Sequence, residues 1–132
     1  MSKKKGFTLV EIMIVVAIIA LLAAIAIPNL LRAKISANDA LAKGTLRTLS
    51  TASETFATTN NGNYPGDITS LTSATGTTPA YLNASYCDQT ISGYQYTCVF
   101  SASSYSYTAT PDVIGTSGTT TWTITTGGVL KP

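Results

Sequence analysis

The hydrophobic residues of this 132-residue chain are concentrated near its N-terminus. From Ile12 to Leu31 no residue is charged, and most are Ile, Leu, Val or Ala. A helix of about 20 apolar residues is long enough to cross a bilayer. The pattern therefore predicts that residues 7–31 form a transmembrane helix.

Beyond this segment the hydrophobic pattern becomes one-sided. Spacings of three and four residues place a mostly apolar set on one face of a helix: Leu31, Ile35, Asn38, Ala42, Leu46, Leu49, Ser53 and Phe56. The charged residues fall largely on the other faces: Arg32, Lys34, Asp39, Lys43, Arg47 and Glu54. Residues 32–59 are thus predicted to be an amphipathic helix that packs against its own domain.

The helical pattern is expected to run from Phe7 to about Thr58. At 1.5 Å per residue it would be about 78 Å long. A compact chain of this length has a radius of gyration of only about 14 Å. The apolar half is therefore expected to project, and it would be stable only in lipid or in a bundle of identical helices.

Turn-forming residues from Asn60 to Asp67 end the predicted helix. They open a connecting region, 60–85, in which the Ser/Thr/Gly-rich stretch from Thr69 to Pro79 is expected to be loop.

Alternating side chains in residues 86–132 predict an antiparallel sheet of three to four strands. The alternating positions are Tyr94, Tyr96, Cys98 and Phe100, then Tyr105 and Tyr107, then Trp122 and Ile124. These aromatic residues are interpreted as core and sheet surface, not as a ligand stack. The predicted fold class is α+β, a long N-terminal helix packed on this sheet, with residues 32–132 together forming a globular head.

The two cysteines occupy positions suited to a cross-strand disulfide. A turn centred on Ser92 and Gly93 would place Ile91 opposite Tyr94 and, counting outward, Cys87 opposite Cys98. Opposed residues have Cα atoms about 4.5 to 5.5 Å apart, within the range that a disulfide accepts. A disulfide would imply an oxidising compartment, and two free thiols are the alternative.

Composition argues against several classes of function. The chain has no His, two Cys and six acidic residues, which offer no zinc site and no Ser/His/Asp or Cys/His catalytic set. Three of the eight basic residues form one run, Lys3, Lys4 and Lys5, and without them the chain carries no net positive charge. No enzyme activity, metal, cofactor or specific nucleic-acid partner is therefore expected.

The N-terminus contains a specific motif. The run Lys3-Lys4-Lys5-Gly6-Phe7-Thr8-Leu9-Val10-Glu11, followed by the apolar segment, resembles the type IV prepilin signature of a short basic leader, Gly, and then Phe-Thr-Leu-x-Glu. The resemblance implies that residues 1–6 are a leader. A prepilin peptidase would cut between Gly6 and Phe7 on the cytoplasmic side and methylate the new Phe7 amine.

Glu11 lies inside the apolar segment, where a carboxylate costs up to about 2.5 to 3.5 kcal/mol. It could reach the interface by extending along the helix, because it lies near the helix end. Alternatively it could pair with the Phe7 amine of its own chain or of a neighbouring subunit. The family pattern favours the neighbour, since that contact would neutralise two charges and promote assembly.

Pro28 is expected to kink or break the helix near the membrane exit. In the family, a proline at this position marks a helix that can locally stretch or melt in filaments. Many members also have a Gly eight residues earlier, where this chain has Ala20.

The resemblance implies a structural subunit of a bacterial type IV pilus with the pilin fold. The precursor would lie in the inner membrane, and the processed chain would polymerise with the inner-membrane assembly machinery into a helical homo-oligomer at the cell surface. Motility, adhesion or DNA uptake would belong to the fibre.

Two other interpretations remain open at this stage. A pseudopilin of a type II secretion system shares the N-terminal motif. A secreted soluble binding domain is the second alternative, because Ala24-Ile25-Ala26 resembles a signal-peptidase site that would release a chain starting near Ile27.

Overall fold

The computed structural model describes residues 6–74 and 78–132. The chain divides into two compact units, one ending at Ala33 and the other comprising Lys34–Pro132. The second is called the globular unit below. Lys3, Lys4 and Lys5 of the expected leader lie outside the described residues.

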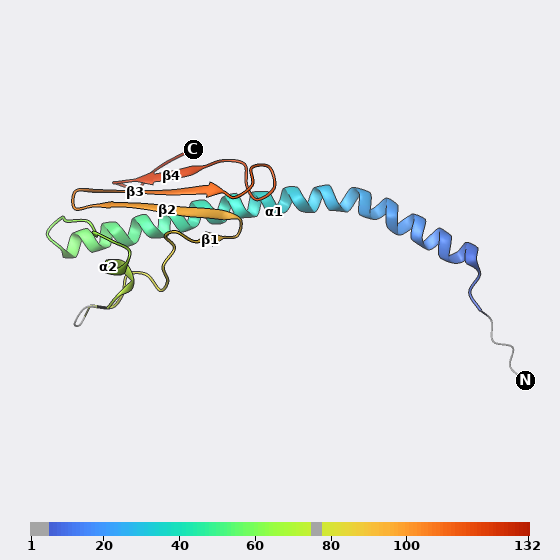
Figure 1. Cartoon of the computed structure of the whole chain (residues 1–132), viewed down its shortest axis with the longest axis horizontal. Helices are drawn as coiled ribbons and strands as arrows, with labels where there is room; N and C mark the ends of the chain where they lie inside the picture. The colour runs from blue at the N-terminus through green and yellow to red at the C-terminus, as the bar shows by residue number, and fades with distance from the viewer. Residues whose placement is uncertain (1–5, 75–77) are drawn as a thin grey trace, which may run out of the picture. The chain divides into compact units, whose positions relative to one another are not determined.

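Helix α1, Leu9–Thr59, is the dominant element (Figure 1). It ends where the turn-forming residues begin, as predicted. Of the expected kink or break at Pro28, the break is wrong, because helical structure continues through this residue. Proline removes one backbone hydrogen bond of the helix, and the adjoining turns on both sides maintain the helical path.

The globular unit packs its sheet along one face of α1. Most of the predicted face is confirmed, with Ala42, Leu46, Leu49 and Ser53 buried. Leu31 was expected on the same face but is 42% exposed. It precedes the globular unit, so helical periodicity alone could not tell where the packing begins.

Five strands form one antiparallel sheet in the order β1-β2-β3-β4-β5. Their bounds are β1 Thr90–Ile91, β2 Tyr94–Ser101, β3 Ser104–Pro111, β4 Trp122–Thr125 and β5 Val129–Lys131. The prediction of three to four strands is too low. The two edge strands have two and three residues, too few for an alternating pattern to be recognised.

The connecting region also differs from the prediction. Residues Thr69–Thr72, expected to be loop, form the one-turn helix α2. The Asp67 Oδ1 atom accepts a hydrogen bond of 2.8 Å from the backbone N–H of Ser70, which orders this turn. Leu71 within it is fully buried, and its carbonyl accepts hydrogen bonds from the backbone N–H groups of Tyr81 and Leu82. The loop thus contributes to the core.

The core lies between α1 and the inner face of the sheet. Its members are small or aliphatic on the helix side and mainly tyrosine on the sheet side: Ala42, Leu46, Leu49, Ala52, Leu71, Leu82, Tyr94, Tyr96, Tyr105, Tyr107, Ala109 and Ile124. The interpretation of these tyrosines as core is confirmed. Small helix residues leave room for the rings, so the sheet can approach α1 closely.

Buried tyrosine hydroxyls need hydrogen-bond partners, and α1 provides most of them. Tyr107 bonds to Ser53 at 2.5 Å, and Tyr105 bonds to Ser50 at 2.7 Å. Among the described residues, the Tyr96 hydroxyl has no partner. The Tyr105 and Tyr107 contacts fix where along α1 strand β3 lies, because both hydroxyls must meet a serine of the helix.

Two carboxylates of α1, predicted to lie off the packing face, also bind the sheet. Glu54 accepts hydrogen bonds from the Tyr105 hydroxyl, the Gly127 N–H and the Tyr64 hydroxyl at 2.8, 2.8 and 3.0 Å. Asp39 accepts hydrogen bonds from the Tyr94 hydroxyl and from the N–H and hydroxyl of Thr119. Both are half-buried, so their side chains border the core instead of facing solvent.

These contacts shift several pKa values. Burial raises the pKa of each carboxyl, but the hydrogen bonds to Glu54 and Asp39 outweigh it, and both pKa values lie below their usual range. Burial, and then the adjacent carboxylates, raise the pKa values of Tyr94 and Tyr105 to about 12. The tyrosines therefore stay protonated donors and the carboxylates stay charged acceptors at neutral pH.

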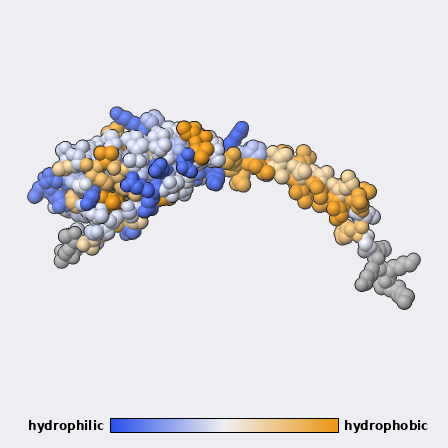
Figure 2. Space-filling model, viewed as in Figure 1, coloured by the Kyte–Doolittle hydropathy of each residue, from blue (hydrophilic) through white to orange (hydrophobic). Residues whose placement is uncertain are grey.

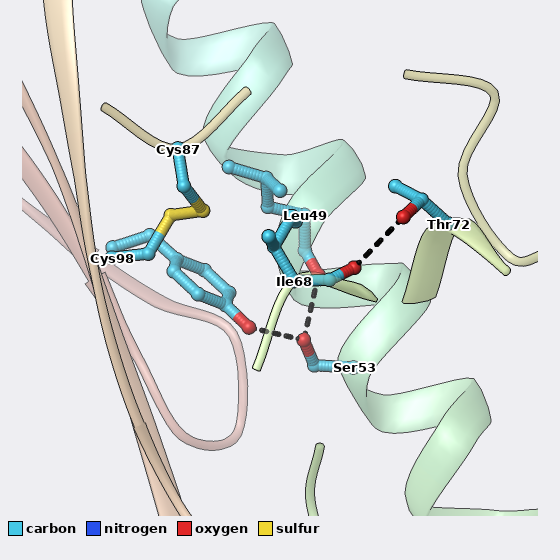
Figure 3. The surroundings of a disulfide bond; sticks show 7 residues. Leu49, Ser53, Ile68, Thr72, Cys87 and Cys98 are labelled. Carbon is cyan, nitrogen blue, oxygen red and sulfur yellow. Dashed lines mark hydrogen bonds between the residues drawn. A yellow bond between two sulfur atoms is a disulfide. The ribbon is translucent and has the colours of Figure 1, made fainter. Parts of the chain in front are cut away.

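The predicted hairpin and disulfide are confirmed. Ile91 pairs with Tyr94 across the Ser92-Gly93 turn, where both residues have positive φ. Cys87 and Cys98 are joined, with Cα atoms 5.5 Å apart (Figure 3). Cys87 lies outside β1, and the bond therefore attaches the segment before β1 to β2.

Replacing Cys87 by Ser should lower the free energy of unfolding of the globular unit by about 2 to 3 kcal/mol. Without the disulfide, the unfolded chain gains conformational entropy. Thermal unfolding of the full chain in neutral detergent measures this. The double variant Cys87→Ser/Cys98→Ser should match the single one. An unchanged melting temperature would contradict the prediction.

Replacing Glu54 by Gln should destabilise the globular unit at pH 7 by about 1 to 3 kcal/mol, since a charged acceptor is lost. The folded protein holds the Glu54 pKa below its unfolded value, so this stabilisation is present above the unfolded pKa and is lost as pH falls through the folded pKa. The difference in melting temperature between variant and wild type should therefore narrow between pH 6 and pH 3.

The matched control for Glu54→Gln is Asp112→Asn, since Asp112 is exposed and its side chain accepts no hydrogen bond from the described residues. Its melting curve should follow that of the wild type. If the difference in melting temperature between Glu54→Gln and the wild type is the same at pH 6 and pH 3, the charge of Glu54 is not its cause.

Candidate assembly site

The N-terminal segment brings Gly6, Phe7 and Glu11 to the start of α1. Residues 6–8 precede the helix in non-helical conformation, and the Phe7 side chain is 85% exposed. A Cβ atom at Gly6 would meet nothing within 4 Å. The peptide bond between Gly6 and Phe7 is therefore accessible, and the chain itself does not require glycine there.

Thr8 and Glu11 cap the helix reciprocally. The Thr8 hydroxyl accepts a hydrogen bond from the Glu11 N–H at 3.2 Å, and Glu11 Oε2 accepts bonds from the Thr8 N–H and hydroxyl, both at 2.8 Å. This is the capping-box arrangement, in which residues at the N-cap and three positions later satisfy each other's backbone groups. The sequence predicted a helix start at Phe7. The capping box explains why α1 begins at Leu9 instead.

The capping box leaves part of Glu11 available. Both bonds from Thr8 reach Oε2, and Oε1 accepts none from the described residues. The carboxylate also lies beside the helix N-terminus, where the backbone dipole favours negative charge. A second donor could therefore bind Glu11 without breaking the cap.

Sequence reasoning missed Thr8 as a site residue. The signal was present, because Thr-x-x-Glu before an apolar run is the sequence form of a capping box. Of the predicted site residues, the structure brings Gly6, Phe7 and Glu11 into one short segment, while Pro28 lies farther along α1. Cys87 and Cys98 belong to the globular unit.

The apolar part of α1 is uncovered. From Ile12 to Ile27 the large hydrophobic side chains are between 51% and 65% exposed, and the most apolar window of 18 residues has no buried residue. Figure 2 shows these orange residues gathered along the first part of the helix. The segment is long and apolar enough to cross a membrane.

The described part of the chain places no metal site beside this segment. Residues 6–74 and 78–132 contain no group of three or more His, Cys, Asp or Glu residues placed to hold a metal ion. What the segment offers is an apolar surface, one carboxylate and an accessible peptide bond. These features suit association and processing of the chain.

Comparison with known proteins identifies the same segment. Residues 1–27 match the family described as "Prokaryotic N-terminal methylation motif". The match includes Gly6, Phe7 and Glu11 together with the Ala24-Ile25-Ala26 sequence. No solved structure is significantly similar to the chain.

Two relatives have names that state their role. The type IV wide pilus major component PilA4 of Thermus thermophilus is 35% identical over 112 residues, which cover 85% of this chain and 86% of that protein. The type IV major pilin protein PilA of Myxococcus xanthus is 50% identical over 54 residues, which cover 41% of this chain and 24% of that protein.

The similarity to the Thermus protein extends through both units of the chain, well beyond the N-terminal motif. Both named relatives are pilus components, which favours a pilin over a pseudopilin or a secreted binding domain. With the uncovered apolar helix and the α+β globular unit, these similarities establish that the chain belongs to the type IV pilin family and is a structural subunit of a pilus.

Proposed function

We propose that the chain is made as a membrane precursor, cleaved between Gly6 and Phe7, and methylated on the new Phe7 amine. The accessible Gly6–Phe7 bond two residues before α1 supports this proposal, together with the methylation motif over residues 1–27. A prepilin peptidase is the partner for this step. The leader 1–6 would remain behind, and residues 7–31 would hold the product in the inner membrane.

Glu11 then guides assembly. Cleavage creates a positive amine at Phe7, beside a helix end that already carries a partial positive charge. Glu11 Oε2 is held by Thr8, so Oε1 can accept the Phe7 amine of a neighbouring subunit. Pairing removes the cost of two separate charges in an apolar environment. The open Oε1 atom is the observation that carries this step.

The apolar surface supplies the remaining driving force for assembly. Side chains from Ile12 to Ile27 are covered either by lipid or by the same segments of other subunits. A filament with these helices at its centre keeps the surface from water, while the globular units can face outward. The inner-membrane assembly machinery would move subunits from one environment to the other, and the filament would form at the cell surface.

Gly6→Val should leave an unprocessed precursor in the membrane. The substitution has room within the chain, so a processing defect would report on recognition by the peptidase and not on misfolding. Mass spectrometry of the N-terminal peptide measures the outcome: methylated Phe7 for the wild type and the intact leader for the variant. Continued cleavage at the same bond in the variant would refute the assignment.

Glu11→Gln should reduce sheared filaments by about tenfold or more, which corresponds to about 1.4 kcal/mol lost per contact. Gln can still complete the capping box, so this variant removes the charge and keeps the helix start. Precursor levels in the membrane should be unchanged or higher, since an apolar segment without a charge inserts more readily.

Asp112→Asn is the matched control for this experiment, because it removes one negative charge at an exposed position of the globular unit. Its filament yield should equal that of the wild type. Normal filament yield from Glu11→Gln would defeat the pairing of Glu11 with an amine, and it would leave the processing step untouched.

A further inference from the structure

A small cavity of about 290 Å³ lies where α1 enters the globular unit. It is lined by Lys34 and Asn38 of α1, the Ser92-Gly93 turn between β1 and β2, and Thr116 and Ser117 of the loop before β4. All six residues belong to the globular unit.

The walls of this cavity are fixed by close contacts. Asn38 donates a side-chain hydrogen bond of 2.8 Å to the Ser117 carbonyl, which holds the loop on the helix. A Cβ atom at Gly93 would lie 2.5 Å from Ser117 Cβ, and the Gly93 φ of +78° also favours glycine. The turn and the loop therefore meet at a distance that only glycine permits, which gives the cavity a formed wall.

The lining carries one positive charge and no carboxylate. Lys34 makes no ion pair with the described residues, and the hydroxyls of Ser92 and Thr116 make no hydrogen bond there. One ammonium group and two free hydroxyls form a set of donors for an anion with a single negative charge. A phosphate diester has this charge.

The position of Lys34 along the chain also suits contact with such diesters in a membrane. It follows Leu31, the end of the apolar segment, by three residues, which is about 4.5 Å along a helix. The headgroup layer on each side of the hydrocarbon core is about 5 to 7 Å thick. If residues 7–31 span the bilayer, Lys34 must lie within that layer.

We propose that this cavity binds the headgroup phosphate of an anionic glycerophospholipid while the subunit is stored in the membrane. The inference rests on the membrane anchoring proposed above. Lys34 supplies the charge, and Ser92 and Thr116 supply hydrogen bonds. The lipid would hold this end of the globular unit at the membrane surface, and a subunit that enters a filament would release it.

The test is a titration of the full chain, ¹⁵N-labelled in neutral detergent micelles, with short-chain phosphatidylglycerol. Saturable chemical-shift changes are expected at the amides of Gly93, Thr116 and Ser117. Lys34→Gln should weaken binding by about fivefold, as expected for one lysine near an anionic surface. Lys43→Gln removes an equal charge from a side chain that lies over the Trp122 ring, 4.7 Å from its centroid, and should leave binding unchanged.

Two further arms separate the possible ligands. Phosphatidylcholine, whose choline group neutralises the phosphate, should bind more weakly than phosphatidylglycerol. Inorganic phosphate should cause the same shifts only at much higher concentration, and equal affinity would overturn the lipid assignment in favour of a free anion. Equal affinity in Lys34→Gln and the wild type would overturn the site itself.

The same sample reports on membrane anchoring separately. A soluble paramagnetic agent should leave the amides of residues 12–27 unaffected if they lie in the micelle. Protection of these amides without shifts around Gly93 would overturn the lipid site and leave the anchor intact. Exposed amides would overturn both proposals.

Discussion

The molecule depends on an apolar helix surface that the chain itself leaves uncovered. The large hydrophobic side chains from Ile12 to Ile27 are more than half exposed. In water this apolar area would cost free energy in proportion to its size. Lipid or other copies of the same helix must cover them. Storage in a membrane and polymerisation are thus two solutions to one physical constraint, and a pilus subunit uses both in turn.

In the proposed assembly, the capping box would add direction to this otherwise uniform surface. Apolar contacts alone do not fix how far one helix slides along another, because they are non-directional. Thr8 fixes the position of the Glu11 carboxylate, and one oxygen of that carboxylate remains open. A charged pair formed there would set the axial position of each added subunit, since only one position along the helix offers the partner.

The globular unit uses a different device to hold its sheet on the polar half of α1. Tyrosine rings fill the core, and their hydroxyls reach Ser50, Ser53, Glu54 and Asp39. The phenols of Tyr94, Tyr105 and Tyr107 bury apolar area and also make directional bonds, so one residue type provides both stability and register. The buried Leu71 then attaches the connecting region to the core, and the disulfide attaches the segment before β1 to the sheet.

The sequence by itself determined the local features. Uninterrupted hydrophobicity predicted the apolar helix, three- and four-residue spacing predicted most of its packing face, and counting outward from Ser92-Gly93 predicted the disulfide. These predictions succeeded because each rests on the short-range geometry of a helix or a hairpin. The Gly6, Phe7 and Glu11 motif likewise lies within one short segment, so its identification needed no tertiary information.

Only the tertiary structure decided which polar residues meet. Glu54 and Asp39 looked like solvent-facing charges, and their roles depend on tyrosines more than 50 residues away. The two short edge strands exist because a neighbouring strand pairs with them, and α2 is ordered around Leu71 in the core. The Lys34 cavity joins three segments distant in sequence. Such contacts depend on how the elements pack. The periodicity of one segment does not show which residues of another segment it will contact.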